Sequence, residues 1–139
     1  MEVTTNSANQ TKEFGKKFSK SLKLGDVVCL FGDLGTGKTT FVQGIAVGLG
    51  IKKRILSPSF FTMREYTNLI HMDFYHQAGE DIKGLDLQEI FNSNKIIVIE
   101  WADKIKKFLP KKRMDIYFEF INEQTRKLRI VKQNGSNRK

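Results

Sequence analysis

The chain has 139 residues, of which 40% are hydrophobic, with 11 Phe and only 2 Pro. This length and composition are typical of one globular domain spanning residues 1–139, which excludes a second catalytic module. No apolar run approaches the roughly 20 residues of a membrane-spanning helix. The polar opening Met1–Asn6 lacks the pattern of a secretory signal peptide, so we expect a cytoplasmic protein.

The net charge of +9 fits an anionic partner such as RNA, but Lys outnumbers Arg by 18 to 6. Arg is the expected residue for bidentate readout of phosphates or bases, so the charge alone gives little support for direct nucleic-acid recognition. The single cysteine, Cys29, cannot form an internal disulfide. Its apolar neighbours predict that it is buried.

The first predicted element is a helix within residues 7–23, with Ser7 as its N-cap. Phe14, Phe18 and Leu22 recur at intervals of four and therefore share one helical face. Lysines occupy the other faces, so the pattern indicates an amphipathic helix.

A strand is predicted at Asp26–Phe31, because its continuous apolar run is typical of a strand buried on both faces. A glycine-rich turn, residues 32–39, follows at once. From Lys38 the apolar pattern predicts a second helix that ends near Gly48 or Gly50. The order is therefore strand, glycine-rich loop, helix.

In the middle of the chain, residues 60–66 and 69–75 are strand-like runs separated by a Thr-Asn turn, which predicts a hairpin. Residues 77–94 are polar with spaced apolar positions and predict one or two short helices. Residues 95–101 contain the most strand-like run of the chain, and we expect a buried strand there.

Towards the C-terminus, residues 114–121 and 125–132 alternate apolar and polar side chains around a short polar turn, which predicts a β-hairpin. The two ends, residues 1–6 and 134–139, are expected to be flexible. Together the elements predict an α/β fold with a P-loop NTPase-like central sheet, flanking helices and a C-terminal β-hairpin.

The loop at residues 32–39 has the order Gly, four residues, Gly, Lys, Thr, between a predicted strand and a predicted helix. Glycines let the backbone N–H groups form an anion-binding nest at the start of a helix. We therefore predict that the loop binds a nucleoside triphosphate, ATP, together with Mg²⁺. Lys38 is expected to reach the β and γ phosphates, Thr39 to give its hydroxyl to magnesium, and Thr40 to touch the α phosphate. The remaining nucleotide contacts in the loop are assigned to Gly32, Gly35, Thr36 and Gly37.

A magnesium site also needs a carboxylate, which in open α/β sheets lies at the C-terminal end of a strand. Glu100 closes the wholly apolar run Ile96–Ile99, whereas Asp73 closes the more polar run Leu69–Met72. We assign Glu100 to the metal, directly or through water, and Asp73 to ordering the attacking water or to a supporting role. With Lys38, these acids are the candidate catalytic residues, although the sequence alone leaves the two acidic roles exchangeable.

The residues resemble the TsaE (YjeE) family, the small ATPase subunit of the bacterial machinery that makes threonylcarbamoyladenosine in tRNA. The resemblance spans most of the chain and is more specific than the phosphate loop alone. The residues that carry it are Thr11, Phe14, Gly15, 32–41, Ser57, Pro58, Ser59, Phe60, His71, Asp73, Tyr75, Ile99, Glu100 and Trp101.

This resemblance implies an accessory ATPase that works with two larger subunits, TsaD and TsaB, in modifying the adenosine beside the tRNA anticodon. The transfer chemistry then belongs to TsaD, and ATP binding or hydrolysis by the small subunit regulates or resets the complex. The family pattern also places Thr39 and Glu100 at magnesium and Thr11 near the adenine. It adds an arginine after the C-terminal hairpin turn, here Arg126, as a nucleotide-binding residue. Two residues depart from it: Ser59 stands in place of Thr, and His76 in place of Arg.

Three other classes of function also use a nucleotide-binding loop. A GTPase is disfavoured because the only Asn-Lys pair, Asn94 and Lys95, lacks the following Asp of a guanine-reading motif. A small nucleotide or nucleoside kinase shares the loop, but the chain leaves little room for an acceptor site and a lid. A non-hydrolytic ATP-gated binding module is the third class. A transition-metal site at His71 and His76 is disfavoured, because the chain has only two His and one Cys.

If ATP occupancy controls docking onto a partner, part of the docking surface is predicted at Ser57–Phe61. This segment follows the phosphate-loop helix and contains a Pro and two adjacent aromatic residues. Its serines could sense the γ phosphate as switch loops do.

Overall fold

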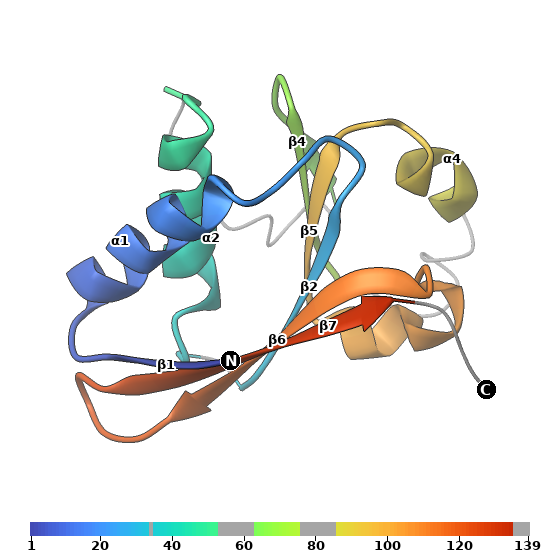
Figure 1. Ribbon diagram of the computed structural model, residues 1–139. Helices are drawn as coiled ribbons and strands as arrows, with labels where there is room; N and C mark the ends of the chain where they lie inside the picture. The colour runs from blue at the N-terminus through green and yellow to red at the C-terminus, as the bar shows by residue number, and fades with distance from the viewer. Residues whose placement is uncertain (34, 53–62, 76–85, 135–139) are drawn as a thin grey trace.

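A mixed β-sheet forms the centre of the computed structural model, which describes residues 1–33, 35–52, 63–75 and 86–134 (Figure 1). Over these residues the sheet has seven strands in the order β1-β7-β6-β2-β5-β4-β3. The elements in chain order are β1 (Glu2–Thr5), α1 (Ala8–Ser19), β2 (Val27–Phe31), α2 (Lys38–Gly48), β3 (Met63–Glu65), β4 (Leu69–Asp73), α4 (Leu87–Phe91), β5 (Ile96–Glu100), the 3₁₀ segment η1 (Ala102–Phe108), β6 (Lys112–Phe120) and β7 (Arg126–Asn134).

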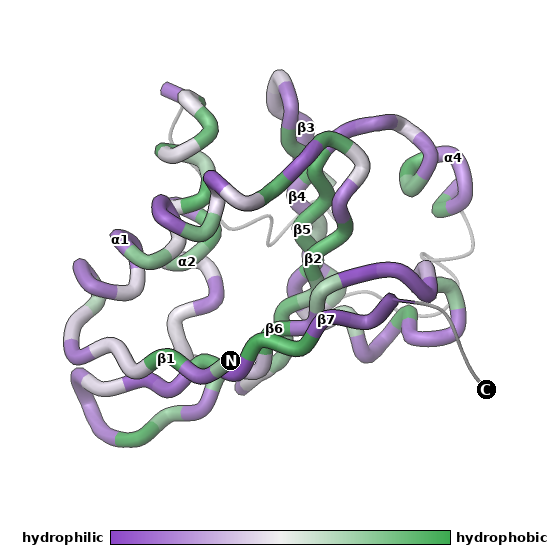
Figure 2. Tube along the Cα trace, in the orientation of Figure 1, coloured by the Kyte–Doolittle hydropathy of each residue, from purple (hydrophilic) through white to green (hydrophobic). Residues whose placement is uncertain are grey.

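The four central strands β4, β5, β2 and β6 run parallel to one another, and the strands at both edges are antiparallel. Parallel strands need helical crossovers, which cover both faces of a sheet and leave its strands apolar on both sides. Figure 2 shows this in the mostly hydrophobic β2, β4 and β5. The predicted α/β fold with a central sheet and a C-terminal hairpin is confirmed.

Two hydrophobic cores lie on the two faces of the sheet. Helices α1 and α2 cover one face, where Phe18 and Phe41 pack with Val28 and Leu30 of β2. On the other face, α4 and η1 pack over the alternate residues of the same strands, including Cys29, which is fully buried as predicted. Strands β2, β4 and β5 therefore contribute to both cores through the two-residue alternation of their side chains, and β6 contributes to the first.

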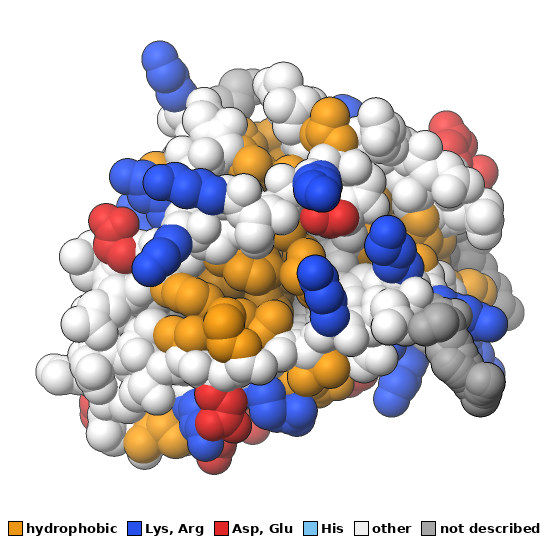
Figure 3. Space-filling model, viewed as in Figure 1, with side chains coloured by type: hydrophobic (Ala, Val, Ile, Leu, Met, Phe, Trp, Pro, Cys, Tyr) orange, Lys and Arg blue, Asp and Glu red, His pale blue; other side chains and the backbone are white. Residues whose placement is uncertain are grey.

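The edge of the first core reaches the surface. Figure 3 shows apolar side chains gathered between α1 and the strands β6 and β7, with Lys and Arg around them. Phe14, Leu22, Met114 and Ile130 are the partly buried residues that α1, the segment after it and these strands add to this core. None of the described helices combines the length and apolar character needed to cross a lipid bilayer.

Helix α1 begins as predicted, with the Ser7 hydroxyl accepting a hydrogen bond from the backbone N–H of Gln10 at 3.0 Å. It ends at Ser19, before the predicted limit at residue 23, and Leu22 packs on the core from the turn that follows. The β3–β4 hairpin, the short helix before β5 and the β6–β7 hairpin are also confirmed within the described residues.

The ends of the chain, which are predicted to be flexible, have regular secondary structure where the structure describes them. Glu2–Thr5 form the edge strand β1, which pairs with β7 from Glu2 opposite Arg129 to Thr5 opposite Arg126. Asn134 pairs with Lys112 at the end of β7, and residues 135–139 lie outside the described part of the chain. Edge pairing depends on backbone hydrogen bonds, so a short polar segment can join a sheet without an apolar pattern.

Helices α1 and α2 cross at a contact between backbones. A Cβ atom on Gly44 would lie 2.0 Å from the carbonyl oxygen of Lys12, and one on Gly15 would lie 2.3 Å from that of Phe41. These distances are far below van der Waals contact and involve backbone atoms, so the two helices must separate to admit any side chain. The crossing also places the first turn of α1 beside the start of α2.

We expect Gly44→Ala to lower the free energy of unfolding by about 1–3 kcal/mol, because the methyl group overpacks a closed helix crossing. Urea unfolding measures this change. Val47→Ala is the matched control, since Val47 lies on the exposed side of the same helix. Equal midpoints for Gly44→Ala and the wild type would show that the crossing is not closely packed.

Candidate functional site

The loop between β2 and α2 adopts the backbone that its glycines allow. Gly32, Gly35 and Gly37 have φ angles of 147°, 78° and 96°, values that residues with a Cβ rarely adopt. A Cβ on Gly32 would also lie 2.8 Å from the carbonyl oxygen of Phe118. Helix α2 begins directly after Gly37, with no side chain capping its first turn. Its N-terminal N–H groups are therefore available to an anion.

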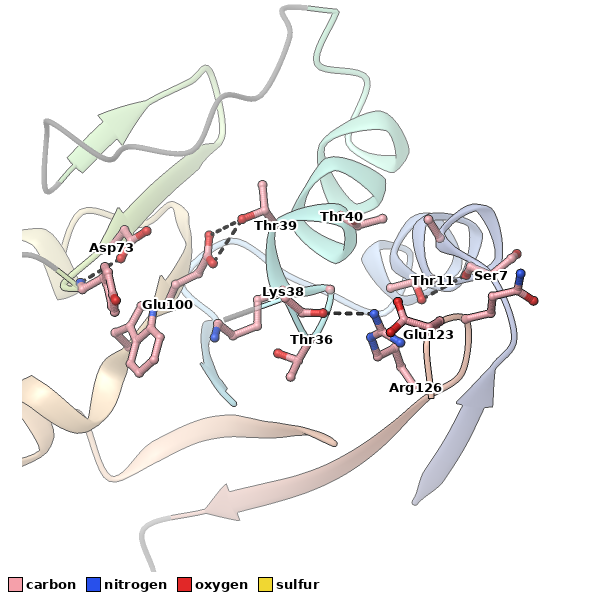
Figure 4. Close-up of a pocket in the computed structure, with 16 residues that line it drawn as sticks. Ser7, Thr11, Thr36, Lys38, Thr39, Thr40, Asp73, Glu100, Glu123 and Arg126 are labelled. Carbon is pink, nitrogen blue, oxygen red and sulfur yellow. Dashed lines mark hydrogen bonds between the residues drawn. The ribbon is translucent and has the colours of Figure 1, made fainter. Parts of the chain in front are cut away.

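A cavity of about 490 Å³ opens over this loop (Figure 4). Ten of the predicted site residues line it: Thr11, Gly35, Thr36, Gly37, Lys38, Thr39, Thr40, Asp73, Glu100 and Arg126. The eleventh, Gly32, does not line the cavity, but its carbonyl oxygen accepts a hydrogen bond from Lys38, which does. Ten of the eleven predicted residues, from five separate regions of the chain, therefore converge on one cavity.

Six further residues line the same cavity: Ser7, Ala8, Tyr75, Trp101, Glu123 and Gln124. Ser7 was predicted only as a helix cap, and Glu123 and Gln124 only as a hairpin turn. Tyr75 and Trp101 each follow a predicted acid closely and are among the residues that carry the family resemblance, but neither was predicted as a site residue. A second cavity of about 500 Å³, among the ends of β6 and β7 and the start of β2, contains none of the predicted site residues.

Lys38 lies across the loop rather than in open solvent. Its side chain is buried, and its ammonium group donates to the carbonyl oxygens of Gly32 and Asp33, the latter at 3.1 Å. The same group lies 4.3 Å from the centre of the Trp101 ring. Burial lowers the pKa of Lys38, an effect opposed by nearby carboxylates, first of all that of Glu100.

The two predicted acids lie side by side at the C-terminal ends of β4 and β5, where Asp73 pairs with Glu100. Glu100 is 3% exposed and accepts a hydrogen bond from the Thr39 hydroxyl, which lies 3.3 and 3.4 Å from its two oxygens. His71 Nε2 lies 2.6 Å from Oε2 of the same carboxylate. Glu100 therefore contacts the threonine at the start of α2, and in the described residues no such contact joins Asp73 to Thr39.

The difference in polarity between the two predicted strands is not accompanied by a difference in burial. Every residue of β4 and of β5 is buried, His71 included. What distinguishes the two acids is their contacts, since Asp73 Oδ1 accepts a hydrogen bond from the backbone N–H of Tyr75 at 2.9 Å. Burial raises the pKa of Asp73, and the neighbouring charge of Glu100 adds to this rise.

The other end of the cavity lies between α1 and the β6–β7 hairpin (Figure 4). The Arg126 guanidinium donates to the carbonyl oxygen of Gly35 at 3.0 Å and so ties the hairpin to the loop. It also lies 4.6 Å from the centre of the Phe120 ring. The hydroxyls of Thr11 and Thr5 are 2.7 Å apart, which ties α1 to β1.

Comparison with known proteins gives one consistent match. The family model "Threonylcarbamoyl adenosine biosynthesis protein TsaE" matches residues 5–128. A protein named tRNA threonylcarbamoyladenosine biosynthesis protein TsaE from Bacillus subtilis is 38% identical over 128 residues, covering 89% of this chain and 80% of the relative. A protein of the same name from Treponema pallidum is 34% identical over 135 residues, covering 94% of this chain and all of the relative.

The fold has a solved counterpart. The crystal structure of Bacillus subtilis YdiB superposes with a TM-score of 0.82 at 32% identity, covering 96% of this chain and 86% of that one. The likeness therefore extends over nearly the whole chain in both sequence and structure.

The raised pKa of Asp73 has a consequence for stability. A carboxyl group whose folded pKa lies above its ordinary value of 3.8 stabilises the fold below that pH and loses this contribution as the pH rises through the folded pKa. Asp73→Asn stays neutral and keeps an acceptor for the Tyr75 N–H. We therefore expect the variant to gain stability over the wild type as the pH rises through this window.

Chemical denaturation at a series of pH values from below 3.8 to neutrality measures this difference. The exposed change Asp103→Asn controls for the loss of one negative charge. A difference between Asp73→Asn and the wild type that stays constant, or falls, with rising pH would contradict the direction of the pKa shift.

Proposed function

The chain belongs to the TsaE family of threonylcarbamoyl adenosine biosynthesis proteins, and we propose that in this tRNA modification it binds and hydrolyses ATP with Mg²⁺. The proposal is carried by one observation. The glycine loop, Lys38 and the buried Glu100 carboxylate, which is hydrogen-bonded to Thr39, converge on one cavity. A P-loop nucleotide site needs these same groups.

The cavity suits ATP in size and in polarity. About 490 Å³ is within the usual range for a small-molecule site. The acids lie at one end of it and Thr11 at the other, with the loop between them (Figure 4). A triphosphate on the loop would direct its γ phosphate towards Glu100 and Asp73, and its base towards Thr11. This orientation supports the assignment of Thr11 to the adenine side.

The oxygen donors suit magnesium. Mg²⁺ prefers hydroxyl and carboxylate oxygens, and the hydrogen-bonded side chains of Thr39 and Glu100 supply both at the start of α2. The carboxylate can hold the metal directly or through water. Bound there, the metal would neutralise charge on the β and γ phosphate oxygens.

The remaining roles belong to side chains of this chain. Lys38 uses two of its three N–H donors on the Gly32 and Asp33 carbonyls, and it would turn one or more of the three to phosphate oxygens. Asp73, whose raised pKa makes it a better proton acceptor than an ordinary aspartate, would accept a hydrogen bond from the attacking water. Arg126 would support the loop through the Gly35 carbonyl and reach the nucleotide from the hairpin side.

We further propose TsaD and TsaB as the partner subunits through which this ATPase acts on tRNA modification. The family membership supports this assignment. The segment Ser57–Phe61, predicted as part of the docking surface, and His76, a departure from the family pattern, both lie outside the described residues.

Lys38→Ala should weaken ATP binding by about 1.5–3 kcal/mol, because it removes a charge-assisted contact with the phosphates. Titration calorimetry on the folded variant measures the loss. Lys20→Ala is the charge-matched control, because Lys20 is the exposed C-cap residue of α1. Wild-type affinity in Lys38→Ala would place the triphosphate elsewhere.

ATP turnover by the purified chain, with and without TsaD and TsaB, separates the classes of function. A partner-regulated ATPase should hydrolyse ATP slowly alone and at a changed rate with both subunits. Turnover stimulated instead by a nucleoside or nucleotide acceptor would favour a kinase. Binding without turnover under every condition would favour an ATP-gated binding module.

A further inference from the structure

His71 is a titratable side chain that the proposed chemistry does not use. It lies in the middle of β4, is 0% exposed, and has Nε2 2.6 Å from Oε2 of Glu100. An ionised carboxylate only accepts hydrogen bonds, so the ring nitrogen donates to it. The other ring nitrogen, Nδ1, has no hydrogen-bond partner in the described part of the chain. The contact with Glu100 is thus the polar contact that holds this ring.

His71 has a charged neighbour on one side in the sheet and aliphatic neighbours elsewhere. Its two-residue alternation places it on the face of β4 that also carries Leu69, and in the register it lies between Val98 of β5 and Arg64 of β3. Leu69 and Val98 belong to the core under α1 and α2. A leucine or valine would fill such a position without the cost of burying an imidazole and a carboxylate together. Stability alone therefore does not account for a histidine here.

The geometry of the contact between His71 and Glu100 explains why a histidine occupies this position. Glu100 Oε2 receives the short hydrogen bond from His71, while the Thr39 hydroxyl lies 3.3 Å from Oε1 and 3.4 Å from Oε2. One short, buried contact restrains the rotation of the carboxylate, and Oε1 keeps lone pairs that the histidine does not take. The carboxylate is thus held with one oxygen available beside the threonine hydroxyl.

We propose that His71 is a positioning residue for the metal: its Nε2–H group orients Glu100 so that this carboxylate and Thr39 present a preformed pair of oxygens to Mg²⁺. The proposal rests on the proposed function, since it needs a metal at that pair. Residues that hydrogen-bond a metal-binding carboxylate fix its orientation, and their loss typically lowers metal affinity about 10- to 100-fold.

Three substitutions separate positioning from simple packing. His71→Leu keeps an apolar side chain of similar size and removes the donor. His71→Gln returns an amide N–H able to reach the same carboxylate oxygen. Leu69→Ala is the matched control, because it opens the core on the same face of the same strand without touching the contact.

Two measurements are needed, neither of which depends on turnover. Calorimetry with ATP in excess EDTA and in Mg²⁺ gives the gain in nucleotide affinity due to the metal. Electron paramagnetic resonance with Mn²⁺ and ADP gives the metal affinity directly. His71→Leu should lower the metal affinity about 10- to 100-fold with the metal-free ATP affinity unchanged, and His71→Gln should recover most of the loss.

Leu69→Ala should lower the unfolding midpoint and leave the metal affinity at the wild-type value. Wild-type metal affinity in His71→Leu, or an equal loss in Leu69→Ala, would overturn the positioning role while leaving Mg·ATP binding intact. If Mg²⁺ does not change the ATP affinity of the wild-type chain, the proposed function is overturned, and this inference with it. If His71→Leu does not fold, His71→Asn, too short to reach Glu100, takes its place with the same expected loss.

Discussion

The buried carboxylate of Glu100 is the constraint on which the rest of the site depends. A charge in a sheet interior is costly unless hydrogen bonds surround it, and here the donors come from Thr39 at the start of α2 and His71 in β4. One side chain of β5 thereby joins two other elements. Because Glu100 contacts Thr39 at the start of α2, the acid links the position of that helix, and of the glycine loop before it, to the sheet.

The same site contains charged side chains whose burial costs free energy. Burial disfavours the charged forms of both Lys38 and Asp73, as their lowered and raised pKa values indicate. Trp101, with a left-handed backbone at φ 57°, turns back so that its ring lies beside Lys38. Such costs are typical of sites arranged for a ligand, because a phosphate and a metal would restore the charge balance that burial has removed.

The sequence predicted most of this fold because its central strands are apolar throughout and its loop has a local motif. The edge strand β1 was not predicted, because it is short and polar and pairs with β7 from the far end of the chain. Thr11 and Arg126 were expected only through a family resemblance. The contact of His71 with Glu100 depends on the register between β4 and β5, which no local pattern specifies.

Crystals grown with Mn²⁺ and a non-hydrolysable ATP analogue test the central claim most directly. We predict one anomalous peak beside the Thr39 hydroxyl, facing Glu100, with the triphosphate on the loop that begins at Gly32. A metal held elsewhere, or a nucleotide seated away from that loop, would contradict it.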